Sequence, residues 1–235
     1  TPLTLEEMRV QKSYAGFDFD AVWMFDTDSG YPFPVLRGVS YTETEENPYD
    51  FEGGNGTAHN PYKVSTPEQL DNVRKYPGAY YIQINDIDLG GVFYNDGRGW
   101  KPIGMEYTPF SGTYDGGNHR IIGLKINRED KYAGLFGYNS GNIKNLGVDG
   151  GAVSSTSTSS YAGGIAGYND GGSISNCYNT GAVSSTSTSS YAGGIAGYND
   201  GGSISNCYNT GAVSSTSTSS YAGGIAGYND GGSIS

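Results

Sequence analysis

Two pairs of carboxylates in this sequence have the spacing of a metal-binding or catalytic pair. Asp26 and Asp28 lie in DTDSG, and Asp86 and Asp88 lie in DIDL. In an extended segment, residues two positions apart point to the same side. Calcium takes about six to eight oxygen ligands, and neither stretch supplies that set or a terminal bidentate Glu. We keep the four residues as calcium candidates and favour turn capping and strand-end hydrogen bonding as their role.

Other side chains that often carry catalysis are few and isolated. His59 in TAHNP and His119 in GGNHRI have no partner nearby in the sequence, and we expect both to form hydrogen bonds in turns. No metalloprotease, nucleophile-elbow or phosphate-loop motif is present. Hydrolysis of a glycoside needs a unique pair of carboxylates, and a repeated segment supplies none. We therefore predict no enzymatic activity and no cofactor.

The two cysteines occupy the same place in two copies of one repeat. Cys177 and Cys207 are thirty positions apart, and no Cys-x-x-Cys pair exists, so a zinc site is not expected. Upstream, Ile121 with Leu124 and Ile143 with Leu146 show the same Ile-x-x-apolar spacing, which favours buried thiols. Stacked side chains point in parallel, so we predict free thiols in a core ladder. Its members are Ile174, Cys177, Ile204 and Cys207.

Charge narrows the classes of partner. The formal net charge is −11, and the repeats from Gly151 onward contain neither Lys nor Arg. Binding to nucleic acid or to anionic membrane surfaces requires clustered basic residues. No apolar run is long enough to span a bilayer, and no signal-like segment opens the sequence. We expect no nucleic-acid partner, no membrane insertion, and a mature form or a fragment.

A thirty-residue unit dominates the second half of the chain. GAVSSTSTSSYAGGIAGYNDGGSISNCYNT occupies 151–180, recurs unchanged at 181–210 and begins again at 211–235. Its apolar residues Val153, Ile165 and Ile174 are separated by Gly and Asn clusters that favour tight turns. One unit is too small to bury its own core, whereas stacked units bury one face continuously. The sequence predicts an all-β fold, a β-solenoid of about three strands per coil.

Stacking of identical units also predicts side-chain ladders. Asn176 with Asn206 would form one amide ladder, and Asn169, Asn199 and Asn229 a second. The tyrosines at 161, 168 and 178 and their copies would form aromatic ladders. If exposed, such ladders could bind glycans or a partner surface; if half-buried, they would seal coil to coil. We favour sealing.

The hydroxyl-rich strip SSTSTSS has two competing interpretations. Val153 and Ile165 are twelve positions apart, whereas Ile126 and Leu135 upstream are nine apart, so the strip carries extra residues and we predict a protruding loop. Such a loop suits O-glycosylation; a flat ice-binding Thr array ranks below it. The candidate residues are Ser155, Thr156, Ser157, Thr158, Thr186, Thr188, Thr216 and Thr218. Asn55-Gly56-Thr57 is a sequon that matters only if the source glycosylates asparagine.

Several motifs resemble the GLUG-motif family. Gly134-Leu135-Phe136-Gly137 matches the Gly-Leu-x-Gly signature, and Gly164-Ile165-Ala166-Gly167 is its counterpart in the repeats. The resemblance covers Gly53 to the C-terminus, with GNGTAHNPYKVSTPEQLDNV and GWKPIG typical of the segment that leads into such arrays. The resemblance implies a β-helix within a secreted or surface-anchored bacterial protein. Members of the family include adhesins and the stalks of secreted proteases, and their GLUG regions are not the catalytic parts.

The chain divides into three predicted regions. Residues 1–46 form an aromatic-rich α+β segment that resembles the closing segment of a GLUG array. Residues 47–110 form a capping segment with a helix at 67–76, for which Thr66 is the N-cap and Gln69 completes a capping box. Residues 111–235 form the solenoid. We predict a small α+β N-terminal capping region on an otherwise all-β chain.

The predicted function is mechanical. We expect an extracellular protein of the bacterial cell surface, non-catalytic, serving as an adhesive stalk or fibre subunit that contacts a host or cell-surface glycan or protein. Head-to-tail assembly would join residues 1–38 to the open C-terminal coil of a neighbour; simple truncation explains the same boundaries. The alternative is a carbohydrate-binding or carbohydrate-cleaving β-helix, and an engineered consensus array also remains open.

Overall fold

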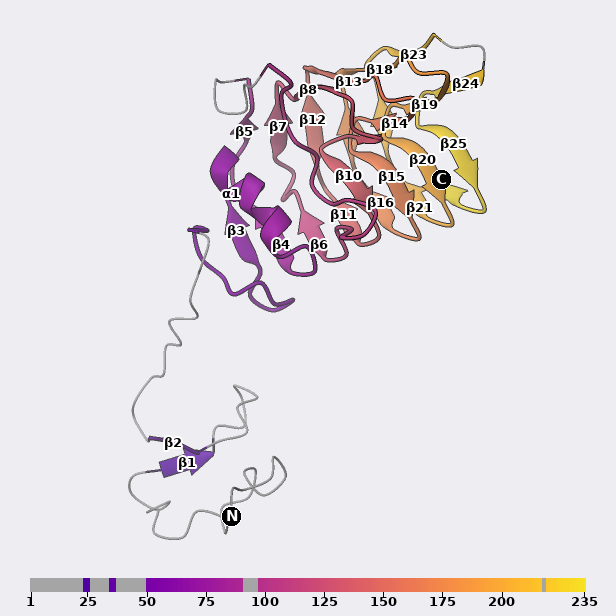
Figure 1. Ribbon diagram of the computed structural model, residues 1–235. Helices are drawn as coiled ribbons and strands as arrows, with labels where there is room; N and C mark the ends of the chain where they lie inside the picture. Colours follow the sequence, from indigo (N-terminus) through magenta and orange to yellow (C-terminus); the bar gives the residue numbers. More distant parts are fainter. Residues whose placement is uncertain (1–22, 26–33, 37–49, 91–96, 217–218) are drawn as a thin grey trace. The chain divides into compact units, whose positions relative to one another are not determined.

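The computed structural model in Figure 1 describes residues 23–25, 34–36, 50–90, 97–216 and 219–235. The chain separates into a unit at Thr1–Glu46 and a unit at Asn47–Ser235. In the first unit, β1 (Trp23–Phe25) pairs antiparallel with β2 (Pro34–Leu36). The calcium candidates Asp26 and Asp28, the predicted N-terminal helix and Thr218 lie outside the described residues.

The second unit is a β-solenoid, which confirms the predicted fold class. Within the first repeat, five short strands replace the expected three: β13 (Ala152–Ser155), β14 (Ser159–Gly163), β15 (Ala166–Asp170), β16 (Ser173–Ser175) and β17 (Tyr178–Asn179). The two unforeseen strands, β14 and β17, carry no large apolar side chain toward the core. Their inward residues are small or polar, such as Ser160, Ala162 and Asn179, so the apolar spacing did not reveal them.

Copies of each strand stack in register and parallel. Val153 pairs with Val183, and Ile174 pairs with Ile204. The second repeat supplies β18 (Ala182–Ser185), β19 (Ser189–Gly193), β20 (Ala196–Asp200), β21 (Ser203–Ser205) and β22 (Tyr208–Asn209). The third supplies β23 (Val213–Ser215), β24 (Ser219–Gly223), β25 (Ala226–Asp230) and β26 (Ser233–Ile234). Figure 1 shows these copies side by side, from orange to yellow, toward the C-terminus.

The non-identical residues upstream form a coil of the same plan. Its strands are β6 (Thr113–Asp115), β7 (Arg120–Ile122), β8 (Lys125–Arg128), β9 (Tyr132–Ala133) and β10 (Phe136–Asn139). The next coil begins with β11 (Asn142–Lys144) and β12 (Gly147–Asp149), which pair with β6 and β7. The sequence alignment of Ile121 with Ile143 was wrong. Tyr114 pairs with Ile143, and Ile121 pairs with Val148. An aromatic ring therefore fills the core position that isoleucine fills in later coils.

The N-terminal end of the solenoid is built from β3 (Tyr62–Val64), α1 (Pro67–Asn72), a 3-10 turn (Val73–Lys75), β4 (Tyr80–Gln83) and β5 (Ile87–Asp88). The helix is shorter than the predicted 67–76, and it buries Leu70 and Val73 in the core. Thr66 is the N-cap and accepts from the Gln69 amide at 3.3 Å. The Gln69 side chain reaches back one residue further than predicted, to the amide of Ser65 at 2.7 Å.

The signature glycines let two layers of backbone touch. A Cβ on Gly167 would lie 2.8 Å from the Ala133 nitrogen and 2.9 Å from the Gly137 oxygen. Contacts this short to backbone cannot be relieved by a side-chain rotation. The strand after the signature therefore packs against the tyrosine-bearing strand of the preceding coil only because the residue is glycine.

A buried amide ladder runs through the corner beside these glycines. Asn139, Asn169 and Asn199 each donate from Nδ2 to the Oδ1 of the next rung, the last being Asn229, at 2.7, 2.7 and 2.6 Å. The first three side chains are fully buried. Each amide also donates to a backbone carbonyl in its own turn, so the ladder satisfies its polar groups while it fixes the register.

The amide ladder predicted between Asn176 and Asn206 does not form in the expected way. Among the described residues, no hydrogen bond joins Asn176 to Asn206. Asn176 has a φ of 53° and donates to Asn145 at 3.2 Å. Asparagine adopts this left-handed conformation more readily than most residues. The backbone at this turn therefore explains why position 176 is asparagine. A ladder that the sequence reasoning missed joins Asn179 to Asn209 at 2.9 Å.

Candidate functional site

Two rows of stacked tyrosines form a strip along the outer corner between the β14 and β15 families of strands. We call this the tyrosine strip. Within each row, successive ring centroids lie 4.9 to 5.5 Å apart. Rings of one row meet rings of the other edge to face, as Tyr161 and Tyr168 do at 5.3 Å and 87°. The rows are Tyr132, Tyr161, Tyr191 and Tyr221, and Tyr138, Tyr168, Tyr198 and Tyr228.

The rings of the strip cover one another's faces. An inner ring such as Tyr161 or Tyr191 is stacked on both sides, and it is half-buried. Sugar rings dock on open aromatic faces, and the inner rings have none to offer. The geometry therefore agrees with the sealing role that we favoured for these residues.

Three phenols of the second row are each tied to a carboxylate of the following coil. The hydroxyls of Tyr138 and Tyr168 donate to Asp170 and Asp200 at 2.9 and 2.7 Å. Tyr198 donates to Asp230 at 3.3 Å, and burial followed by this carboxylate raises the pKa of Tyr198 to about 12. These bonds run diagonally between coils, so they add a second link in the stacking direction.

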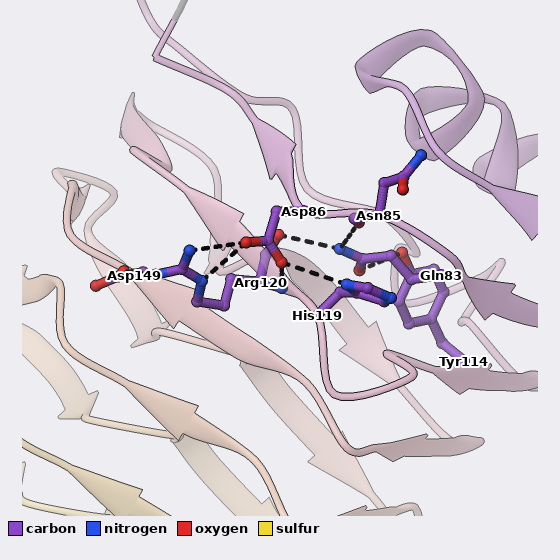
Figure 2. A network of polar contacts seen from close by, with 7 residues as sticks. All are labelled: Gln83, Asn85, Asp86, Tyr114, His119, Arg120 and Asp149. Atoms are coloured by element: carbon purple, nitrogen blue, oxygen red, sulfur yellow. Dashed lines mark hydrogen bonds and ion pairs between the residues drawn. The ribbon is translucent and has the colours of Figure 1, made fainter.

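A network of polar contacts joins the first coils on another face (Figure 2). Arg120 on β7 donates from Nε and Nη2 to Oδ2 of Asp86 at 3.0 and 2.7 Å, and from Nη1 to Asp149 at 2.9 Å. Asp149 in turn accepts from the Thr180 hydroxyl at 2.9 Å. Four successive turns of chain are thus linked by one chain of charged and polar groups.

The two remaining calcium candidates are committed to other bonds. Asp86 is engaged by Arg120, and Nδ1 of His119 lies 3.4 Å from its Oδ1. Asp88 accepts from the Gly90 amide at 2.7 Å, as a turn cap does. In the described part of the chain, no group of three or more His, Cys, Asp or Glu side chains is arranged to hold a metal ion.

Beneath the network lies a fully bonded buried pair. Tyr114 donates its hydroxyl to Oε1 of Gln83 at 3.0 Å, and Gln83 donates to the carbonyls of Asn85 and Arg120 at 2.8 and 3.0 Å. Burial raises the pKa of Tyr114 far above its usual range. These contacts could not be predicted from local sequence because Gln83 lies one turn of the solenoid before Tyr114 and Arg120.

Acid is expected to weaken this network. Hydrogen bonds from the Arg120 side chain and backbone lower the pKa of Asp86 below its ordinary value of 3.8. A lowered folded-state pKa contributes stability that is present above pH 4 and is lost as the pH falls through the folded value. We expect Asp86→Asn to reduce the difference in unfolding free energy between pH 6 and pH 3, measured by urea denaturation.

The salt dependence supplies the control for that experiment. Asp86 is exposed, so its attraction to Arg120 is screened by salt, and in about 1 M NaCl the difference between the parent and Asp86→Asn should shrink. A variant whose acid dependence equals that of the parent at low salt would contradict the assignment of this ion pair.

The hydroxyl-rich strip is not the protruding loop that the sequence predicted. Its two ends lie in β13 and β14, joined by a short bend, and Ser155 is buried, so this candidate for surface glycosylation was wrong. Ser155 donates to the Asp130 carbonyl at 2.9 Å. Ser160 hydrogen-bonds to Ser185 and, at 3.0 Å, to Ser187. Small serine side chains let the extra residues fold inward.

The described threonines of that strip face solvent, as do the serines at its end, Ser159 and Ser189. Thr156, Thr158, Thr186, Thr188 and Thr216 are exposed, and Ser157 is half-buried. The Thr188 hydroxyl donates to the Thr158 carbonyl at 3.2 Å. O-glycosylation at these threonines remains a prediction. An ice-binding surface would have fewer exposed hydroxyls than the sequence suggested, because Ser155 and Ser160 are buried.

The cysteines lie in the core as free thiols. The Cys177 amide donates to Sγ of Cys207 at 3.4 Å, and each thiol points to a backbone carbonyl of its own turn at 3.2 Å. The hydrogen bond with Cys207, followed by burial, raises the pKa of Cys177, and the same contact lowers the pKa of Cys207 to about 7.

Comparison with known proteins identifies the repeat. The family described as "The GLUG motif" matches residues 158–184 and 188–214. The repeats are GLUG motifs. Each matched range begins near a tyrosine-bearing strand and ends in the next coil, so the GLUG unit and the structural coil have the same period of thirty residues.

Two curated relatives match about half of this chain. The first, "Putative Gly-rich membrane protein" of Evansella cellulosilytica, is 37% identical over 134 residues, which are 55% of this chain and 16% of that protein. The second, "Halomucin" of Haloquadratum walsbyi, is 37% identical over 112 residues, 44% of this chain and 1% of that protein. This chain thus corresponds to a small part of each relative's length.

A solved structure has a similar fold. The crystal structure of "a putative immunoglobulin A1 protease" from Bacteroides ovatus aligns with a TM-score of 0.66 and 33% identity, covering 78% of this chain and 58% of that chain. Neither curated relative is named as an enzyme, whereas the solved neighbour is. In the part of this chain that the structure describes, no helix has the length and apolar character needed to cross a membrane.

Proposed function

We propose that this chain is a non-catalytic spacer segment of an extracellular or cell-surface protein, whose GLUG coils set the length and stiffness of a stalk. Three observations support the proposal: the in-register stacking, the names of the two curated relatives, and the recurring Asn–Asn and Tyr–Asp bonds between coils. Adhesion and fibre formation are finer proposals that rest on the same relatives.

The observation that carries the proposal is that each repeat makes the same bonds to its neighbour. The Asn169–Asn199 bond recurs as Asn199–Asn229, and the Tyr168–Asp200 bond recurs as Tyr198–Asp230. A coil therefore adds about 4.8 Å of length and a fixed set of contacts. Length can change by whole repeats without altering any interface, which suits a spacer.

Removal of one repeat tests this directly. Deleting residues 181–210 joins Thr180 to Gly211, which recreates the natural junction between Thr210 and Gly211. We expect the shortened chain to fold cooperatively, to lose about 4.8 Å of length by small-angle X-ray scattering, and to show a smaller urea m-value because less surface is buried. A chain with an additional copy should show the opposite changes.

A half-repeat deletion is the matched control. Deleting 181–195 removes half a period, so it places unlike residues on top of one another and should lose the cooperative transition. If both deletions were equally damaging, coil length would not be the modular property that we propose. Release of sugar or peptide from polysaccharides or casein by the purified parent chain would contradict the non-catalytic part.

Head-to-tail assembly through residues 1–38 and the last coil stays a proposal. Most of residues 1–38 lie outside the described residues, so the contact is argued from the sequence alone. Sedimentation velocity of the chain with and without residues 1–46 tests it. Monomers at all concentrations in both forms would contradict assembly while leaving the spacer role intact.

A further inference from the structure

A pocket lies where the tyrosine strip begins. It has a volume of about 260 Å³ and is lined mainly by Lys101, Met105, Glu106, Tyr107, Lys131 and Tyr132. This volume is near the lower end of the roughly 300–1,000 Å³ found for small-molecule sites. The pocket therefore suits a ligand with the size of a single ring.

The pocket exists because a hairpin interrupts the stack. Ile103 and Phe110 form parallel bridges to Phe136 and Asn139. Residues 103–110 therefore occupy the position in the stack next to β10, on the side away from β15. Between these bridges the chain turns out at Met105 and Thr108, whose amides each donate to the other's carbonyl at 3.0 Å. Backbone hydrogen bonds thus hold the turn. Between the same two bridge positions, the next coil has only the two residues Gly137 and Tyr138.

The hairpin holds apolar side chains out in water. Tyr107 is 93% exposed, the highest fraction among the large apolar side chains of the described residues. Met105 is 52% exposed. Exposed apolar groups gathered on a rigid turn beside a cavity are characteristic of a binding surface. No core contact of this fold requires a tyrosine at position 107.

Tyr132 lines the pocket and is the first ring of its row in the tyrosine strip. One face of its ring is stacked on Tyr161 at 5.5 Å, and the rings of Tyr138 and Tyr168 meet it edge to face. Nζ of Lys131 lies 4.8 Å from the Tyr132 centroid and 5.8 Å from the Tyr161 centroid. The ammonium thus makes cation–π contacts at the end of the tyrosine strip that borders the pocket.

The charged groups around the pocket have both signs. Lys101 and Lys131 are donors, Glu106 and Asp130 are acceptors, and Nζ of Lys131 lies 3.6 Å from Glu106. A simple anion or cation would meet repulsion as well as attraction there. A neutral ring that carries hydroxyls on its edge and C–H groups on its face can use every one of these groups.

We propose that this pocket binds one pyranose ring of a glycan, with the apolar face of the sugar against Tyr107 and Tyr132 and its hydroxyls bonded to Lys101, Glu106 and Lys131. The spacer role does not depend on this site. The site would add a recognition function at one defined place along the solenoid, because the later coils have no hairpin of this kind in their repeated sequence.

Saturation-transfer NMR on the purified 235-residue chain tests the proposal. The probes are methyl β-D-galactopyranoside, methyl β-D-glucopyranoside, methyl α-D-mannopyranoside and N-acetyl-D-glucosamine, with inorganic phosphate and tetramethylammonium as charge controls. We expect transfer to the ring C–H protons of at least one sugar. Tyr107→Ala should weaken that binding about threefold to tenfold, the value of one aromatic contact.

Two further variants make the result decisive. Tyr208→Ala removes a tyrosine that is 54% exposed and lies on another face, so it should leave sugar binding unchanged. Glu106→Gln, on the exposed turn, should weaken binding without affecting the thermal midpoint. The proposal is overturned if no sugar receives saturation, if only phosphate or tetramethylammonium binds, or if Tyr107→Ala and Tyr208→Ala have the same effect.

Discussion

Gly194→Ala is expected to destabilise the chain by about 3 kcal/mol, at the upper end of the usual range for overpacking. A Cβ at this position would overlap the carbonyl oxygen of Gly224 and the side chain of Asn209. The carbonyl belongs to the next repeat and is backbone that cannot rotate away, whereas Asn209 lies later in the same repeat as Gly194. Urea denaturation followed by circular dichroism measures the loss.

The next repeat supplies the matched control. Gly224 occupies the same position of the GLUG signature, but in this chain no atom lies within 4 Å of its added Cβ. Neither glycine has a positive φ, so alanine meets no backbone strain at either place. We expect Gly224→Ala to change stability by no more than about 0.5 kcal/mol. Equal losses in the two variants would mean that the signature glycine is needed for something other than stacking.

Asn169→Ala is expected to cost about 2 to 4 kcal/mol. The buried amide accepts from Asn139 and donates to Asn199 and to the Gly172 carbonyl. Its removal leaves several buried polar groups without partners, and each such group costs about 1–3 kcal/mol. The unfolding free energy from urea titration gives the value.

The exposed end of the same ladder is the control for that substitution. Asn229 accepts from Asn199 and donates to Gly232, but it lies at the surface, where water replaces the lost bonds. Asn229→Ala should therefore cost less than about 1 kcal/mol. If Asn169→Ala were equally mild, water would be reaching the interior of the ladder, and the amides would not be what fixes the register.

These two predictions concern contacts between identical residues. In a stack of copies, the same residue occurs once covered by a following coil and once uncovered, so the difference between the two substitutions reports the contacts between coils. This is why the pairs Gly194 with Gly224 and Asn169 with Asn229 serve as internal comparisons. Few globular folds place the same residue in a covered and an uncovered position within one chain.

The amino-acid sequence alone determined the solenoid, its period and much of its interior. The unchanged thirty-residue unit required stacking, and the isolated Ile and Val residues marked which side faces inward. Thr66 and Pro67 marked the start of the only helix in the described residues. The amide ladder at Asn169 followed from identical residues lying on top of one another.

Only the tertiary structure decided how finely the coil is divided and where its polar groups go. Strands β14 and β17 bury serine, alanine and asparagine, which carry no apolar signal, so their number and the inward position of Ser155 could not be read from spacing. The Arg120 network and the pocket at Tyr107 join residues from different turns. Such contacts depend on which turn lies above which, and local sequence does not contain that information.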